Sequence, residues 1–276
     1  MLPDGLTLGP VALRVHNVER MYAFYGQALG MRLHDQLADG TCIIGSDTQA
    51  LVHLIPDADA RPAPRSAGLY HMALLYPTRA ALAAQLAHYA NLGLRLDGAS
   101  DHGVSEALYL HDPEGNGIEL YVDRPQAAWP MEHGQLAMVS DALDLHALLH
   151  DAGELQAPMM GHVHLHVGDL DASRHFYVDI LGFTLMQRYG HAAEFVSVAG
   201  YHHHLGYNIW RGKHAPPAPA NATGLVWWQI TLPDAASLTA VQARVQAAGM
   251  AVIAADDATI LVRDPAGNQV RITVAA

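Results

Sequence analysis

The sequence is poor in cysteine, in long apolar runs and in positive charge. One cysteine, Cys42, occurs among 276 residues, which excludes a disulfide framework and a metal cluster held by several thiolates. Every apolar run is shorter than the roughly 18 residues that a membrane-spanning helix needs. The N-terminus, MLPDGLTLGP, lacks the basic start and cleavage site of a signal peptide. We therefore expect a cytoplasmic protein without a membrane partner, whose metal ligands, if any, are His, Asp or Glu.

Basic side chains are few and scattered. The 15 Lys and Arg stand against 27 Asp and Glu, which gives a formal net charge of -12 at pH 7. Such a surface repels phosphate backbones, so we expect no nucleic-acid partner. Hydrophobic residues make up 51% of the chain, which suffices for the cores of two domains at this length. Self-association into a homo-oligomer is compatible with this composition.

Histidine, by contrast, is abundant, with 19 residues in the chain. Neutral imidazole is the commonest metal ligand in proteins, and it exchanges protons near neutral pH. The positions of the histidines within repeated structure are therefore informative.

One sequence pattern occurs twice, as VALRVHNVERMYAFYGQALGMRL from Val11 and as VHLHVGDLDASRHFYVDILGFTL from Val163. In each copy, an alternating apolar run predicts a strand. Asn17 or Asp169 predicts the start of an amphipathic helix, and Leu-Gly predicts its end before a second strand. The Phe-Tyr pair inside each helix is expected to lie in the core.

A second pattern begins at Gly68 and recurs from Gly224. Each copy predicts a strand, a helix and further strands, with a tight Asp-Pro-x-Gly-Asn turn that starts at Asp112 or Asp264. The chain therefore contains four related modules of strands around one helix. The pattern lapses between residues 123 and 160, which we interpret as a linker between two halves.

Aligning the modules brings ionisable side chains to equivalent positions of the first and last strands. The first strands place there Pro10, His71, His162 and Trp227, and the last strands place His53, Glu119, His203 or His204, and Arg271. Two histidines and one glutamate are the candidate metal ligands: His71, Glu119 and His162. Two imidazoles and one carboxylate can occupy one face of Fe(II) and leave three adjacent positions open.

These three ligands meet only if the second module pairs with the third, which would build a single metal site between the halves. The first and fourth modules would then surround a degenerate site lined by Pro10, His53, Trp227 and Arg271. We expect His53 and Trp227 to be core residues. Because side chains in a strand alternate, His162, His164 and His166 share one face, so His164 is expected to contact the substrate or to support the ligands.

The second module contains a spacing typical of ring-cleaving enzymes. The residues concerned are His102, Leu108, Tyr109, Asp112, Pro113, Gly115 and Glu119. They resemble the extradiol signature H-x5-[aliphatic]-Y-x2-D-P-x-G-x3-E, with a departure at Ser100. Apart from the linker, nearly the whole chain resembles the vicinal-oxygen-chelate superfamily of glyoxalases, fosfomycin-resistance proteins and extradiol dioxygenases. It is most similar to the bacterial two-domain catechol-2,3-dioxygenase family, and crossed pairing of modules is known among hydroquinone dioxygenases of the superfamily.

This resemblance implies an α+β fold, in which four βαβββ modules form two vicinal-oxygen-chelate domains with half-barrel sheets. The first domain would span residues 1–124, the linker 125–157 and the second domain 158–276.

The resemblance also implies roles for individual side chains of the site. Tyr109 would hydrogen-bond a substrate oxygen, and His102 would line the substrate site. His203 would serve as acid and base, because HHLGY resembles the run that carries that histidine. The alignment can slip within the three consecutive histidines, so His204 is the alternative. His164 and His204 are expected to bind substrate.

Together these features predict an Fe(II) extradiol dioxygenase that opens catechol-like rings with O2, the ion being held by His71, Glu119 and His162. Mn(II) or Zn(II) would fit the same ligands, and a hydroquinone is an alternative to catechol. A glyoxalase-type isomerase or a thiol transferase is a second hypothesis, although such enzymes usually have another carboxylate on the last strand of the third module. A third is a non-catalytic small-molecule-binding protein, which would have an incomplete triad.

Overall fold

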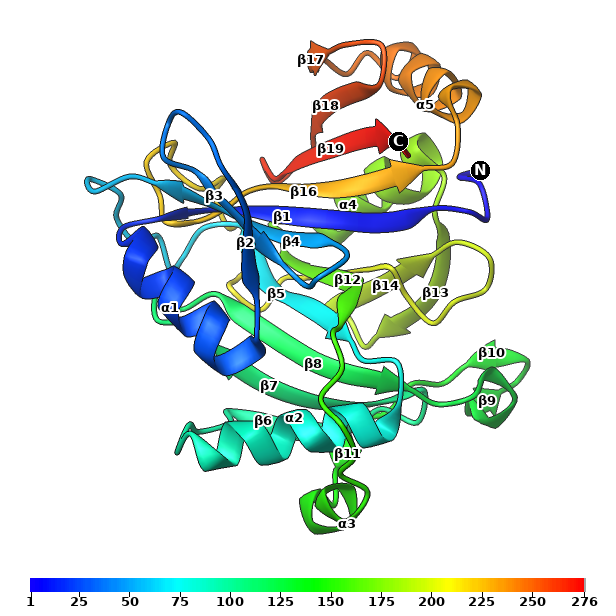
Figure 1. Ribbon diagram of the computed structural model, residues 1–276. Helices are drawn as coiled ribbons and strands as arrows, with labels where there is room; N and C mark the ends of the chain where they lie inside the picture. Colours follow the sequence, from blue (N-terminus) through cyan, green and yellow to red (C-terminus); the bar gives the residue numbers. More distant parts are fainter. Residues whose placement is uncertain (276) are drawn as a thin grey trace.

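Two β-sheets form the body of the protein in the computed structural model, which describes residues 1–275 (Figure 1). One sheet has eight strands and the other has nine, and a two-stranded hairpin lies apart from both. The α+β fold with four repeated modules and half-barrel sheets, predicted from the sequence, is confirmed.

The eight-stranded sheet combines the first and fourth modules, in the order β17-β18-β19-β16-β1-β4-β3-β2. Its strands are β1 (Thr7–Val15), β2 (Arg32–Gln36), β3 (Cys42–Gly45), β4 (Ala50–Pro56), β16 (Gly224–Leu232), β17 (Val252–Ala255), β18 (Thr259–Arg263) and β19 (Gln269–Val274). The two modules are joined where β1 pairs antiparallel with β16.

The nine-stranded sheet combines the second and third modules, in the order β11-β6-β7-β8-β5-β12-β15-β14-β13. Its strands are β5 (Gly68–Leu75), β6 (Gly98–Asp101), β7 (Ser105–His111), β8 (Gly117–Asp123), β11 (Asp141–Ala142), β12 (Met159–His166), β13 (Thr184–Tyr189), β14 (Ala193–Ser197) and β15 (Leu205–Asn208). The junction is the antiparallel pair of β5 and β12. The crossed pairing that the candidate ligands required is therefore confirmed.

The two helices whose starts were predicted, after Asn17 and Asp169, begin there in the structure. The helices of the four modules are α1 (Val18–Leu29), α2 (Arg79–Asn91), α4 (Leu170–Arg174) with a π-helical continuation η2 (His175–Leu181), and α5 (Ala235–Ala247). Asn17 caps α1 by accepting a hydrogen bond from the Arg20 amide, and Asp169 caps α4 in the same way. Gly30 and Gly182 end the two repeated helices with φ of 67° and 98°, a region that glycine enters at little cost. Among residues 1–275, no helix is both long and apolar enough to cross a bilayer.

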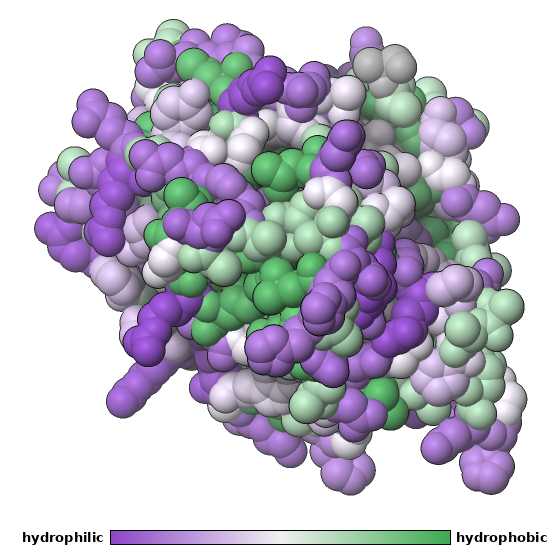
Figure 2. Space-filling view, turned by 60° about the horizontal axis from the view of Figure 1, so that its bottom comes forward, coloured by the Kyte–Doolittle hydropathy of each residue, from purple (hydrophilic) through white to green (hydrophobic). Residues whose placement is uncertain are grey.

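The segment between the halves has short elements of its own. They are η1 (Gln126–Ala128), the β9 (Met131–Glu132) and β10 (Gln135–Leu136) hairpin, β11, and α3 (Leu145–His150). β11 extends the nine-stranded sheet by pairing with β6. Figure 2 brings the side of α2 and α3 forward and shows hydrophilic residues around much of this face, with hydrophobic residues gathered near its centre. The surface here is thus largely polar but interrupted by apolar area.

Each half of the chain holds the two sheets together through a buried tyrosine. Tyr25 on α1 donates a hydrogen bond to Oδ2 of Asp112 at 2.9 Å. Tyr177 on η2 donates to Oδ2 of Asp264 at 2.8 Å. Both aspartates open an Asp-Pro-x-Gly-Asn turn between two strands, and the other carboxylate oxygen accepts backbone amides of that turn. A helix from one sheet is thereby bonded to a hairpin of the other.

Removing either tyrosine hydroxyl is expected to destabilise the fold. Tyr25→Phe and Tyr177→Phe each leave a buried carboxylate short of one donor, which costs about 1–3 kcal/mol. Urea unfolding followed by circular dichroism should show lower midpoints for both variants. Tyr22→Phe, at a position that is 38% exposed, is the control. A midpoint for Tyr25→Phe equal to that of the control would contradict this account.

Candidate metal centre

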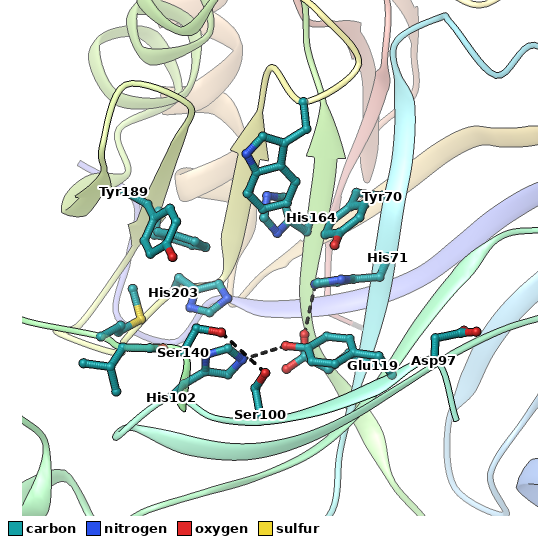
Figure 3. A pocket seen from close by; sticks show the side chains of 15 residues that line it. Tyr70, His71, Asp97, Ser100, His102, Glu119, Ser140, His164, Tyr189 and His203 are labelled. Atoms are coloured by element: carbon teal, nitrogen blue, oxygen red, sulfur yellow. Dashed lines mark hydrogen bonds and ion pairs between the residues drawn. The ribbon is translucent and has the colours of Figure 1, made fainter. Parts of the chain in front are cut away.

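Three side chains from three neighbouring strands converge in the nine-stranded sheet, and Figure 3 shows two of them, His71 and Glu119. Nε2 of His71, on β5, lies 3.0 Å from Oε2 of Glu119, on β8. Nε2 of His162, on β12, lies 3.3 Å from the same oxygen. The three ligand atoms lie within 4.8 Å of one another, and all three residues are buried. The structure thus brings together the candidate ligands that the sequence predicted.

Strand register explains this convergence. β5 lies between β8 and β12, pairing parallel with the first and antiparallel with the second. Glu119 is opposite Ala73, two residues beyond His71 on the same face of β5. His162 is also opposite Ala73, so both partners approach the space above this small side chain. An alanine between three long polar side chains leaves room for a bound ion.

The donor set fits a divalent metal ion. Nε2 of His71 is buried and makes no hydrogen bond with any of residues 1–275. Two ligand atoms about 2.1 Å from an ion and at right angles to each other are about 3.0 Å apart, close to the separations here. Burial lowers the pKa of His71 to about 3, which keeps the imidazole neutral, as a ligand must be. The three residues could therefore hold a metal ion.

His102 and Tyr109 form a pair beside Glu119. Nδ1 of His102 lies 2.7 Å from the Val139 carbonyl oxygen and therefore carries a proton. Its Nε2 then accepts a hydrogen bond from the Tyr109 hydroxyl at 2.7 Å. Tyr109 is directly opposite Glu119 across β7 and β8. Burial, reinforced by Glu119, raises the pKa of Tyr109, so the phenol keeps its proton at neutral pH.

A cavity of about 410 Å³ opens onto these residues. His71, His102, Tyr109, Glu119, His164 and His203 all line it (Figure 3). The ring of His203 lies 4.1 Å from that of His162, measured between centroids. The ring of His164 lies 5.1 Å from that of His71. Of the six predicted catalytic and ligand residues, all but His162 thus line one cavity together with His164.

His204 lies elsewhere. Its Nδ1 is 2.8 Å from Oγ of Ser197, its ring packs on Tyr201, and among the described residues it is not part of the cavity wall. His204 therefore does not face the cavity. The structure brings His203 to it.

The prediction that His203 or His204 occupies, in the third module, the strand position that Glu119 occupies in the second module was wrong. That position is Gly206, which is opposite His164 on β12 as Glu119 is opposite Ala73 on β5. A Cβ at Gly206 would be 3.0 Å from Cγ of His164, so glycine makes room for that imidazole. Asn208 holds the ring by donating to Nε2 at 3.0 Å. The histidines precede β15 in an irregular segment that sequence alignment cannot count reliably.

Aromatic side chains complete the cavity wall, and the sequence did not identify them. They are Tyr70, Tyr189, Phe195 and Trp210. Tyr70 packs edge-on against His164 and Trp210, with centroid distances of 5.0 Å in both cases. Trp210 follows β15 in a loop, where periodicity carries no information.

A sequence profile of the Glyoxalase/Bleomycin resistance protein/Dioxygenase superfamily matches residues 7–120 and 159–272. The chain belongs to this superfamily. A curated relative, the catechol-2,3-dioxygenase of Bacillus subtilis (strain 168), is 38% identical over 269 residues, which cover 94% of this chain and 93% of that protein. The superfamily membership predicted from the sequence is therefore confirmed.

Solved structures of other proteins share the fold. Glyoxalase I from Zea mays has a TM-score of 0.62 and 16% identity, covering 98% of this chain and 92% of that chain. The cppA protein of Streptococcus pneumoniae TIGR4 has a TM-score of 0.57 and 12% identity, covering 98% of this chain and all of the other, at 100%. At such identities the likeness shows the architecture and says nothing of the chemistry.

At the degenerate site of the eight-stranded sheet, His53 and Trp227 pack against each other but are only half-buried, so the prediction that they are core residues was wrong. The ring of Trp227 lies 5.0 Å from that of His53, and the Arg271 guanidinium lies 5.3 Å from the Trp227 centroid. Burial and the nearby Arg271 lower the pKa of His53 to about 4. Within residues 1–275, no second group of three ligand atoms resembles that of the nine-stranded sheet. This superfamily member thus has one site suited to a metal ion.

Substitutions at the two sites are expected to separate the metal ligands from His53, a half-buried histidine that is not a ligand. His71→Ala and His162→Ala should each lower Mn(II) affinity about 100-fold or more. Removing a residue that only supports a ligand typically costs about 10- to 100-fold, and removing the ligand itself should cost more. His53→Ala should bind Mn(II) like the unaltered protein. Isothermal titration would measure the affinity, and circular dichroism would verify folding. Equal affinity in all three variants would exclude the triad as the metal site.

Proposed function

We propose that the protein is an Fe(II)-dependent extradiol dioxygenase that cleaves catechol-like rings with O2. The observation that carries the proposal is the triad of His71, Glu119 and His162 at the wall of a cavity. Tyr109 and His203 line the same cavity. The curated relative at 38% identity, named a catechol-2,3-dioxygenase, supports the same reaction class.

The three ligands would hold the ion on one face. When bound, Fe(II) would supply adjacent positions for the two diol oxygens and for O2, and would allow electrons to pass from the diol to O2. The side chains of the cavity would then orient the aromatic ring of the diol and transfer its protons. The cavity offers an approach for the diol, because His71 and Glu119 line it while all three ligands are buried.

Tyr109 and His203 have separate tasks in this proposal. The Tyr109 hydroxyl, oriented by Nε2 of His102, would hydrogen-bond a bound diol oxygen. His203 would accept the proton that the diol loses on binding and return it later in the reaction. A side chain in this role contributes typically about 10²- to 10⁴-fold to the rate.

The composition of the cavity wall indicates which diols fit. Its charged side chains, Asp97 and Glu119, are acidic, and within residues 1–275 neither Lys nor Arg contributes to the lining. The aromatic rings of Tyr70, Phe195 and Trp210 offer apolar contact instead. A carboxylate on the ring would enter without a cationic partner, which is costly. We therefore propose uncharged catechols as the substrate class.

A glyoxalase-type isomerase is the alternative on this scaffold. Gly206 occupies the last-strand position of the third module, where a further carboxylate ligand is usual in such enzymes. The three-ligand arrangement accordingly favours the dioxygenase.

Ring cleavage is the direct test. Protein loaded anaerobically with Fe(II) and mixed with catechol in air should form a yellow product, with one O2 consumed per ring opened. His203→Gln should lower kcat about 10²- to 10⁴-fold while the bound iron is unchanged. His175→Gln, at an exposed position, is the control. Bound iron without product or O2 uptake would refute the proposal.

Substrate charge is expected to matter. The kcat/KM for 4-methylcatechol should exceed that for 3,4-dihydroxybenzoate by about tenfold or more, equivalent to about 1.4 kcal/mol, because no cation meets the carboxylate. Initial rates of O2 uptake over a range of both diols would measure the ratio. Equal values would show that the lining does not select by charge.

A further inference from the structure

His203 takes part in a chain of buried hydrogen bonds that leads away from the cavity. Its Nδ1 lies 2.8 Å from Nδ1 of His202. Nε2 of His202 lies 2.8 Å from Oδ1 of Asp123, at the end of β8. His202 is fully buried, whereas the Asp123 side chain is 28% exposed. The carboxylate therefore ends the chain at the edge of the protein interior.

The acceptor at the end determines the direction of every bond in the chain. An ionised carboxylate only accepts, so Nε2 of His202 must carry a proton. A neutral imidazole has one N–H, which leaves Nδ1 of His202 as an acceptor. Nδ1 of His203 must then be the donor between the two rings. Nε2 of His203 is left with a free lone pair, and it makes no hydrogen bond with any of residues 1–275.

Two tyrosine hydroxyls also donate hydrogen bonds toward Asp123, which is consistent with an ionised carboxylate at the end of this hydrogen-bond chain. The Tyr201 hydroxyl donates to Asp123, at 3.0 Å from Oδ2 and 3.2 Å from Oδ1. The Tyr121 hydroxyl lies 2.8 Å from that of Tyr201 and donates to it, since the proton of Tyr201 is already engaged. A Cβ at Gly161 would be 1.9 Å from the Tyr121 hydroxyl oxygen, so glycine is required where this network passes β12. Asp123 thus receives donors from both sides.

The surroundings of His202 keep it neutral and in place. Burial lowers the pKa of His202, although Asp123 acts in the opposite direction. The ring packs between Tyr201, at a centroid distance of 4.0 Å, and Trp129 of the segment between the halves, at 5.4 Å. Trp129 is itself anchored by a hydrogen bond from Nε1 to the Arg124 carbonyl. The ring therefore has little freedom to rotate out of the chain.

We propose that Asp123 and His202 are positioning residues that fix the tautomer of His203, with Nδ1 protonated and Nε2 open to the cavity as a proton acceptor. The tautomer follows from the hydrogen bonds alone, whereas its use on a diol rests on the proposed function. The opposite tautomer would present an N–H to the cavity and could not accept a proton. A carboxylate that holds an imidazole in the productive tautomer has large kinetic effects in hydrolases.

The tautomers of His202 and His203 can be determined by NMR spectroscopy without any enzymatic reaction. Long-range ¹H–¹⁵N spectra of ¹⁵N-histidine protein, metal-free and loaded with diamagnetic Zn(II), distinguish Nδ1–H from Nε2–H, and His202→Gln and His203→Gln assign the signals. We expect Nε2–H for His202 and Nδ1–H for His203. In Asp123→Asn the amide can donate as well as accept, so both rings should become tautomeric mixtures. An Nε2–H signal for His203 in the unaltered protein, or unchanged tautomers in Asp123→Asn, would overturn the proposal.

Kinetics then test the use of this tautomer. In the iron-loaded protein, Asp123→Asn and His202→Gln should each lower kcat for catechol about 10- to 100-fold, with KM changed by less than about threefold and bound iron unchanged. Asp179→Asn, which removes the carboxylate of an exposed His-Asp pair, is the matched control. Altered tautomers with unaltered kcat would overturn the catalytic use of the network. Absence of ring cleavage in the unaltered protein would refute the proposed function, while the spectra would still decide the tautomer.

Discussion

The antiparallel pairing of β5 with β12 is the contact on which the site depends. It joins a module of the first half to a module of the second half, so that His162 is opposite Ala73, two residues beyond His71 on the same face of β5. Glu119 reaches that space through the parallel pairing of β5 and β8. Neither His71 nor His162 would be a credible ligand alone, because a buried histidine is commonly a core residue. Their convergence is a property of the sheet.

Hydrogen bonds that end on fixed acceptors give the cavity its chemistry. His102 is oriented by the Val139 carbonyl and so presents a lone pair to Tyr109. His203 is oriented by His202 and, through it, by Asp123. Such networks are strong in a buried environment only when every member has a partner. In both cases the hydrogen-bond partner of a histidine decides which of its ring nitrogens carries the proton.

The two sheets are built from the same kind of module, but among residues 1–275 only the nine-stranded sheet has a cavity beside a group of candidate metal ligands. Both are built by the same crossed pairing, yet Trp227 and Arg271 fill the site of the eight-stranded sheet, whereas the nine-stranded sheet keeps a cavity. The residues at equivalent strand positions, and not the architecture, make the difference.

From the sequence alone came the four modules, the helix starts at Asn17 and Asp169, the turns at Asp112 and Asp264 and the three candidate ligands, because all of these depend on local periodicity and turn chemistry. Gly206, rather than a histidine, at the last-strand position of the third module was decided only by the tertiary structure. The tertiary structure also decided the aromatic cavity wall and the hydrogen bonds from Asp123 through His202 to His203. These depend on how irregular segments pack against strands that are distant in the sequence. Local sequence specifies strands and turns, whereas strand register and loop paths result from the packing of the whole chain.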